Sequence, residues 1–233
     1  MKKSAFFLSL LNLALLAITG FFLIRERLQA PERIFARSVN GIVEVRAVAG
    51  DRESAGSAVV ISAAGELITN FHVVTYNEDG ERVIFEEISV RMATEEDYHE
   101  VEVIRTDADN DLALLRVVDA EYRAKLKAIA LEKGKIENGE TCYAIGNMAS
   151  QGISISQGIL SNTSVRIVID GEARSYIQAE INIAAGSSGG ALLNERGKLI
   201  GITTLRLKDQ YGNPQYGYGY SIPVSVIVRF LNA

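Results

Sequence analysis

Short apolar stretches, separated by glycines and polar turns, recur along most of the chain after residue 35. Few of them keep the 3.6-residue repeat of an amphipathic helix, so they predict strands rather than helices. The strands predicted in this way are 57–62, 65–69, 101–104, 111–118, 141–145, 164–169 and 199–205. Residues 119–126 and 224–231 are compatible with short helices. The pattern therefore predicts an all-β chain.

The predicted strands fall into two groups, 36–118 and 139–233, and the charged stretch 119–138 connects them. The roughly 200 residues that follow residue 35 fit either one α/β domain or two small β-barrels that share a cleft. The 20 glycines and the many short apolar runs favour the two barrels, with a closing segment at the end of the second.

The first 35 residues differ from the rest of the chain. Lys2 and Lys3 precede an uncharged run from residue 4 to residue 24, which would span about 32 Å as a helix and could cross a ~30 Å hydrocarbon core. A cleaved signal peptide is the alternative, but it needs a shorter apolar region and a small-residue cleavage site. We expect 1–35 to be an uncleaved transmembrane anchor and linker. The lysines predict a cytoplasmic start, which places the rest of the chain outside the cytoplasm.

Composition argues against several other functions. The net charge of −5 is unfavourable for a nucleic-acid surface. The single cysteine, Cys142, cannot form an internal disulfide, and its apolar neighbours predict a buried side chain rather than a catalytic thiol. Two histidines and one cysteine without close spacing give no zinc site, and the chain has no phosphate-binding glycine loop. We expect neither a metal nor a cofactor.

A glycine-rich segment, 186–190 (Gly-Ser-Ser-Gly-Gly), lies between the apolar stretches 177–183 and 191–193. A hydroxyl that attacks a carbonyl needs backbone N–H groups beside it to receive the oxyanion, and glycines bring such groups close. A flexible connector is the alternative, but connectors seldom lie between apolar strands. The segment is therefore a candidate nucleophile loop, in which the N–H groups of Gly186 and Ser188 would form the oxyanion hole.

A serine nucleophile requires a histidine base at neutral pH. His72 lies near the end of the apolar stretch 67–74 and is the candidate base, although an isolated histidine there is more often structural than catalytic. His99 lies in the acidic stretch 95–100, and we interpret it as a solvated surface residue.

The base in turn needs a carboxylate that fixes its tautomer. Asp111 lies at the start of the predicted strand 111–118, where it could orient the histidine or form a turn. Asp107 and Asp109 precede it and are typical turn formers.

Six segments carry a resemblance to a known family, and they occur in the same order as its motifs. They are 56–61 (GSAVVI), 69–74 (TNFHVV), 107–115 (DADNDLALL), 144–148 (AIGNM), 177–192 and 219–223 (GYSIP). Together they resemble the HtrA/Deg family of chymotrypsin-like serine proteases over about 38–230. The chain departs from the family pattern at Phe71, Met148, Ala184, Ala185 and Ser187, and none of these departures removes a triad residue.

The resemblance implies two six-stranded antiparallel β-barrels, the first carrying His72 and Asp111 and the second carrying Ser188. It implies a serine endopeptidase of unfolded or misfolded polypeptides, with Ser188 as nucleophile, His72 as general base and then acid, and Asp111 orienting the imidazole. The family usually carries a PDZ domain after the protease. The sequence ends at Ala233, so we expect no PDZ-gated control. A homotrimer is a further possibility that the family suggests.

The resemblance also suggests a primary specificity pocket. Its floor would be Asn182, six residues before the nucleophile, and one wall would include Thr204 and Arg206. None of these supplies the carboxylate that a buried Lys or Arg side chain requires. We therefore expect cleavage after small or medium uncharged residues such as Val, Ala or Ile.

A non-catalytic protease-like protein, which holds unfolded chains or a partner in its cleft, is the alternative function. The intact set of His72, Asp111 and Ser188 argues against it. The replacement of the family's Asn-Pro by Ala184 and Ala185 argues for it, because it could loosen the nucleophile loop.

Overall fold

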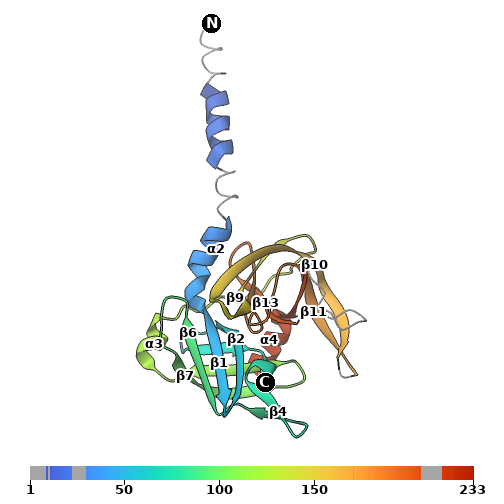
Figure 1. The fold of residues 1–233 in the computed structure, drawn as a ribbon. Coiled ribbons are helices and arrows are strands. Elements are labelled where there is room, and N and C mark those ends of the chain that lie inside the picture. Colours follow the sequence, from blue (N-terminus) through green and yellow to red (C-terminus); the bar gives the residue numbers. More distant parts are fainter. Residues whose placement is uncertain (1–8, 10, 23–29, 170, 206–216) are drawn as a thin grey trace.

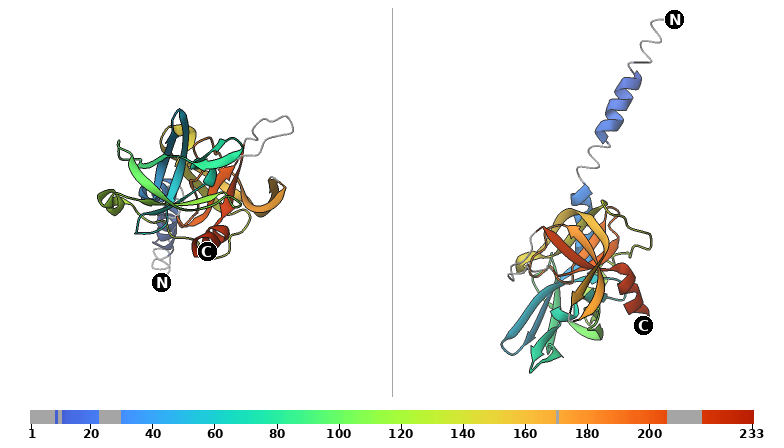
Figure 2. Two further views of the ribbon diagram at one scale, coloured as in Figure 1. Left: turned by 90° about the horizontal axis from the view of Figure 1, so that it is seen from below. Right: turned by 90° about the vertical axis from the view of Figure 1, so that its right-hand side faces the viewer.

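The computed structural model describes residues 9, 11–22, 30–169, 171–205 and 217–233. A helix that includes residues 11–22 projects away from the two sheets (Figures 1 and 2). Within the described ranges, no helix combines the length and the apolar character that a membrane crossing requires. The expected anchor, residues 4–24, lies partly outside the described residues.

The first sheet is a closed barrel of six antiparallel strands, in the order β1-β2-β3-β8-β7-β6. The strands are β1 (Ile42–Ala49), β2 (Arg52–Val60), β3 (Glu66–Thr69), β6 (Glu87–Met92), β7 (His99–Asp107) and β8 (Leu112–Val117). A separate two-stranded sheet pairs β4 (Thr75–Glu78) with β5 (Glu81–Ile84). The barrel interior is apolar, with Val45, Val60 and Leu115 almost completely buried.

The second sheet also closes into a ring of six strands, in the order β10-β11-β14-β13-β12-β9. Its strands are β9 (Thr141–Asn147), β10 (Ile153–Ile169), β11 (Glu172–Glu180), β12 (Ala191–Asn194), β13 (Leu199–Leu205) and β14 (Tyr218–Pro223). β10 and β11 form a long hairpin that extends from the body of the sheet (Figure 1). The predicted mostly β architecture with two six-stranded sheets is confirmed.

Short helices lie at the ends of the sheets. They are α2 (Ala30–Ser38), α3 (Ala120–Lys125), α4 (Val224–Asn232) and the 3-10 turns η1 (Val39–Gly41), η2 (Phe71–Val73) and η3 (Met148–Ser150). The Asp119 carboxylate begins α3 by accepting the backbone N–H groups of Glu121 and Tyr122, which have no partner within the helix. α4 buries Val226, Ile227 and Phe230, the spacing of one helical face.

The two sheets share one apolar cluster. Ile42, Val59 and Ile68 of the first sheet belong to the same buried cluster as Tyr143 and Ile145 of the second. Burying a side chain of this size stabilises a fold by roughly 1.5–3 kcal/mol. The shared cluster holds the sheets together and fixes the loops between them.

The structure extends the predicted strands. All seven are present, but β2 begins at Arg52 and β10 at Ile153, earlier than the sequence indicated. Seven of the described strands were not predicted: β1, β4, β5, β6, β11, β12 and β14. In β11, the polar residues of the exposed face interrupt the apolar run.

The interpretation of His99 as a solvated residue is wrong. Its ring stacks on Tyr122 at 3.8 Å between centroids, and its Nδ1 lies 3.1 Å from Asp119 Oδ2. Only 21% of the side chain is exposed. Glu95 also contacts the ring, with Oε2 3.4 Å from His99 Nε2. The local sequence does not reveal the contacts with Asp119 and Tyr122, which lie 20 or more positions away.

Candidate active site

His72 and Asp111 form the centre of the candidate site. His72 lies in η2, directly after β3, and its Nδ1 is 2.9 Å from Asp111 Oδ2 and 3.0 Å from Oδ1. Its backbone N–H donates to the same carboxylate at 3.0 Å. An ionised carboxylate accepts a hydrogen bond from Nδ1–H, so the neutral ring keeps its lone pair on Nε2. His72 is thereby oriented as a base.

Asp111 has a backbone conformation that few side chains adopt. Its φ is +54°, in the left-handed region that aspartate tolerates better than most residues. Asn70 Nδ2 donates to its backbone carbonyl oxygen at 3.0 Å, and the preceding turn is closed by Asp107, which accepts the N–H of Asn110. Strain of this kind is common at functional sites, where surrounding contacts hold it in place. Here it turns the carboxylate toward His72.

Thr204, in β13, also binds the carboxylate. Its hydroxyl donates to Asp111 Oδ2 at 2.6 Å. Burial acts to raise the pKa of Asp111, but the hydrogen bonds and charge of His72, together with the Thr204 hydroxyl, outweigh it and hold the pKa below its usual value. Asp111 is therefore ionised at neutral pH.

Ser188 reaches this group through the backbone of Thr204. Its hydroxyl donates to the Thr204 carbonyl oxygen at 3.1 Å, and the residue is half-buried. Within the described residues, the hydroxyl is bonded to this carbonyl rather than to His72. One hydrogen-bonded chain thus connects Ser188, Thr204, Asp111 and His72, which come from both sheets.

The peptide group between Ala185 and Gly186 has a fixed orientation. The Ala185 carbonyl oxygen accepts the N–H of Ala149 at 2.7 Å. In a trans peptide the N–H points opposite to the carbonyl, so the Gly186 N–H points away from Ala149. Gly186 has a φ of +86°, and a β-carbon there would collide with the Asn147 carbonyl oxygen. Only glycine fits this position.

The peptide group between Ser187 and Ser188 is held in a similar way. The Ser187 carbonyl oxygen accepts the N–H of Gly190 at 2.9 Å and the hydroxyl of Thr203. The Ser188 N–H therefore points away from these partners. In the part of the chain that the structure describes, neither the Gly186 nor the Ser188 N–H is bonded. Both remain available to an incoming oxygen.

A model of a known family matches residues 56–202, a stretch that includes His72, Asp111 and Ser188. Its description is "Trypsin-like peptidase domain". The chain belongs to this family.

Individual relatives of this trypsin-like peptidase chain agree with the family match. The serine endoprotease DegS of Salmonella typhimurium is 29% identical over 218 residues, 91% of this chain and 56% of the relative. The periplasmic pH-dependent serine endoprotease DegQ of Escherichia coli K12 is 32% identical over 173 residues, 73% of this chain and 35% of the relative.

A solved structure has the same fold. The structure described as HtrA-type protease AlgW with tripeptide is 29% identical, with a TM-score of 0.72 over 85% of this chain and 61% of that chain. The predicted resemblance to the HtrA/Deg family is confirmed. The chain spans about half the length of the DegS relatives that it matches.

Within this trypsin-like domain, Ser57 is a residue whose role the sequence did not reveal. It is fully buried in β2, and its hydroxyl donates to the Gly186 carbonyl oxygen and accepts the N–H of Asn147, both at 2.8 Å. Its backbone N–H donates to the Ser188 carbonyl oxygen at 2.8 Å. Ser57 thus bonds the nucleophile loop to both sheets. In the sequence, the only sign of a role for Ser57 was its position in the 56–61 motif.

The structure does not bring the residues of the predicted specificity pocket together in a described pocket. Asn182 is exposed on the segment between β11 and the nucleophile loop. The Thr204 side chain is directed to Asp111, and Arg206 lies outside the described residues. The pocket stays a prediction.

Cys142 is buried, as the sequence indicated. Burial raises the pKa of its thiol to about 12, so the thiol stays protonated at neutral pH. It is a packing residue of β9.

Proposed function

We propose that the chain is a serine endopeptidase of polypeptides, with Ser188, His72 and Asp111 as its catalytic triad. The observation that supports this most is the Asp111 carboxylate, which binds both His72 Nδ1 and the hydroxyl of Thr204. Thr204 in turn holds the Ser188 hydroxyl through its carbonyl oxygen. This arrangement orients a base and connects it, through Asp111 and Thr204, to the nucleophile; acyl transfer requires both groups.

In the first half-reaction, the Ser188 hydroxyl leaves the Thr204 carbonyl by rotation about its Cα–Cβ bond and turns to His72 Nε2. Its oxygen attacks the scissile carbonyl carbon as Nε2 takes its proton. The C=O electron pair moves to the oxygen, and the N–H groups of Gly186 and Ser188 bind the resulting oxyanion. Asp111 stabilises the imidazolium without taking a proton.

Collapse of the intermediate breaks the C–N bond, and His72 donates the same proton to the departing amine. An acyl ester on Ser188 remains. Water then attacks this ester while His72 again acts as base, and the protonated His72 returns the proton to the Ser188 oxygen as the acid product leaves. The enzyme is restored.

A fluorophosphonate probe tests this proposal, because it reacts with an activated serine hydroxyl. We expect the full chain in non-ionic detergent to form one adduct, which tryptic mass spectrometry assigns to Ser188 rather than to Ser187. Ser188→Ala should remain unlabelled. Absence of labelling in a folded chain that carries Ser188 would contradict the assignment.

The non-catalytic binding protein is the second candidate. It is favoured by the bond of the Ser188 hydroxyl to the Thr204 carbonyl oxygen, which leaves the nucleophile turned from the base. The same probe separates the two functions. A chain that binds denatured casein but neither cleaves it nor reacts with the probe would be the binding protein.

We also propose that the amino-terminal helix anchors the chain in a membrane, with the catalytic residues outside the cytoplasm. The large apolar side chains of this helix are exposed on all sides: Leu11, Leu13, Leu15, Leu16, Ile18, Phe21 and Phe22. Exposed apolar surface of this extent favours contact with lipid. The DegQ relative is named as a periplasmic endoprotease, which supports the same side of the membrane.

Two finer proposals follow from the family. We propose unfolded or misfolded polypeptides as substrates, and a homotrimer as the assembly. Light scattering of the detergent-solubilised chain distinguishes a trimer from a monomer by mass.

A further inference from the structure

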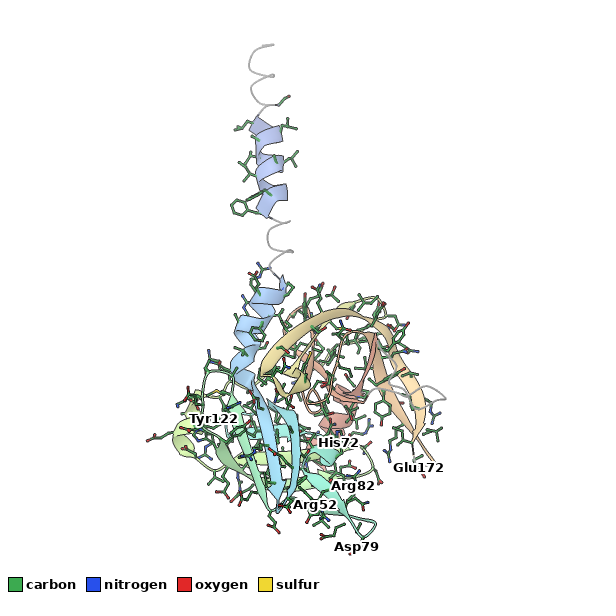
Figure 3. The ribbon with its side chains drawn as sticks, in the orientation of Figure 1. Arg52, His72, Asp79, Arg82, Tyr122 and Glu172 are labelled. Carbon is green, nitrogen blue, oxygen red and sulfur yellow. The ribbon has the colours of Figure 1, made fainter. Side chains whose placement is uncertain are left out.

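A cavity of about 370 Å³ opens beside the candidate triad. Its lining includes His72, Arg82, Asp111, Arg174, Tyr176 and Thr204. Arg82 comes from β5, and Arg174 and Tyr176 come from the β10–β11 hairpin. The first sheet, the β4–β5 sheet and the second sheet therefore each contribute to one cavity that reaches the base. Figure 3 shows Arg82 close to His72, and Glu172 at the far end of the hairpin.

The cavity has an excess of positive charge. Asp111 is the one carboxylate among its described lining residues, and its oxygens are already bonded to His72 and Thr204. Among the residues that the structure describes, neither Arg82 nor Arg174 forms an ion pair. The chain as a whole has a net charge of −5, whereas this cavity has two guanidinium groups that form no ion pair with a described residue. They can attract an anionic group to this point.

The strand register explains why Arg174 faces the cavity. Arg174 lies opposite Ile167 and Tyr176 opposite Val165, so both side chains are on one face of the hairpin. Two positions apart on this face, the two side chains are neighbours, and the hydrogen bond and charge of Arg174 act against the rise that burial causes in the pKa of Tyr176. Arg174 is half-buried and held by this contact. Its guanidinium is thus partly preorganised for a ligand.

We infer that this cavity is a subsite for an acidic side chain of the substrate polypeptide, and that Arg82 and Arg174 bind its carboxylate. The inference rests on the proposed function. A guanidinium offers a planar pair of N–H groups that matches a carboxylate. An extended chain rises about 3.3 Å per residue, so a cavity that touches His72 serves a residue within about four positions of the cleaved bond. The acidic residue lies on one side of that bond.

Cut-site mapping tests the inference directly. Denatured casein is digested by the full chain in detergent, and mass spectrometry counts Asp and Glu at each of the four positions on either side of the cuts. We expect acidic residues to be enriched about fivefold at one of these positions, the upper range for an exposed ion pair. The enrichment should weaken in 0.5 M salt, because salt screens exposed charges.

Charge reversal identifies the residues responsible. The double variant Arg82→Glu with Arg174→Glu should lose the acidic enrichment and favour Lys or Arg at the same position. Arg166→Glu is the matched control, since Arg166 is exposed in β10 and lies opposite Ser175, on the other face of the hairpin. This control should keep the wild-type cut pattern. An acidic enrichment that survives the double variant, or that Arg166→Glu also removes, would overturn the assignment.

A binding measurement separates failure of the subsite from failure of catalysis. The probe is the fluorescein-labelled peptide Ala-Ala-Glu-Glu-Val-Ser-Ala-Ala, compared with versions that carry Gln or Lys at both Glu positions. Full-length Ser188→Ala should bind the Glu peptide about fivefold more tightly than the Gln peptide, and the Lys peptide most weakly. Equal affinities would refute the subsite, even if the wild type cleaves casein and reacts with fluorophosphonate. The expected ranking would support the subsite, even if the wild type neither cleaves nor reacts.

Discussion

The Ser57 hydroxyl lies 2.8 Å from the Gly186 carbonyl oxygen, although 129 residues separate the two in the chain. The same hydroxyl accepts the Asn147 N–H, so one buried side chain connects a strand of the first sheet to two segments of the second. These contacts hold the peptide groups of the nucleophile loop in the orientation that leaves the Gly186 N–H open. Ser57 is therefore a positioning residue of the proposed oxyanion hole.

We predict that Ser57→Ala lowers kcat about tenfold with little change in KM. The loss is smaller than the 10²–10³-fold typical of removing an oxyanion donor, because the Gly186 N–H is still present but less well held. The variant also leaves buried polar groups without a partner, which destabilises the fold by about 1–3 kcal/mol. Ser54→Ala, on the same strand, is the control. Urea denaturation and steady-state kinetics measure both effects, and unchanged kcat with reduced stability would limit Ser57 to a structural role.

The triad residues should differ in their contributions. Ser188→Ala and His72→Ala should each reduce turnover of casein on the order of 10⁶-fold, because nucleophile and base act as a unit. Asp111→Asn should cost on the order of 10⁴-fold, since it offers His72 the wrong hydrogen-bond pattern. Rates measured on purified, folded variants test this order. Substantial cleavage by Ser188→Ala would show that another group is the nucleophile.

The Thr204 hydroxyl should stabilise the ionised form of the Asp111 carboxylate. Thr204→Val removes the hydroxyl bond to Oδ2 but keeps the size of the side chain and the backbone carbonyl that holds Ser188. We expect kcat to fall about tenfold, in line with the loss of one hydrogen bond to a charged group. Thr204→Ser keeps the hydroxyl and should restore most of the rate. If Thr204→Ser were as slow as Thr204→Val, packing rather than the hydroxyl would be the cause.

The lowered pKa of Asp111 predicts a pH dependence of stability. The carboxylate is more acidic in the folded chain than in the unfolded chain, so its contribution is present above the unfolded pKa of about 3.9 and is lost as pH falls through the folded pKa. The difference in unfolding free energy between wild type and Asp111→Asn should therefore shrink below about pH 4. Urea denaturation in detergent from pH 2 to pH 7 measures it. A difference that stayed constant over this range would mean that Asp111 gains no stabilisation from its partners.

The proposed anchor predicts how the chain behaves in membranes. If the uncharged run 4–24 stays in the bilayer, the chain should resist carbonate extraction and keep Met1 in its mature form. Leu15→Arg with Leu16→Arg should release it, because charges near the centre of a span are costly. Leu28→Arg, outside the run, is the control. Amino-terminal sequencing that finds a start near Gly20 would instead indicate a cleaved signal peptide.

The sequence by itself predicted the mostly β architecture and supplied the candidate residues of the site. Period-2 and short apolar runs are local properties, so they identified strands such as β3, β8 and β13 almost to the residue. The glycines of 186–190 likewise indicate a tight loop. At Gly186 the positive φ of such a loop excludes most other residues. The order of the motifs placed a serine, a histidine and an aspartate in the pattern of a known family, and this identified the three candidate residues.

Only the tertiary structure decided which other residues serve these three. Ser57, Asn70 and Thr204 orient the site through hydrogen bonds to residues at least 16 positions away. The sequence also did not reveal the left-handed φ of Asp111 or the position of Arg82 and Arg174 in the lining of one cavity. Such contacts depend on how two closed sheets pack against each other. Hydrophobic periodicity specifies which face of a strand is buried, but it carries no information about which distant polar group a buried side chain will meet.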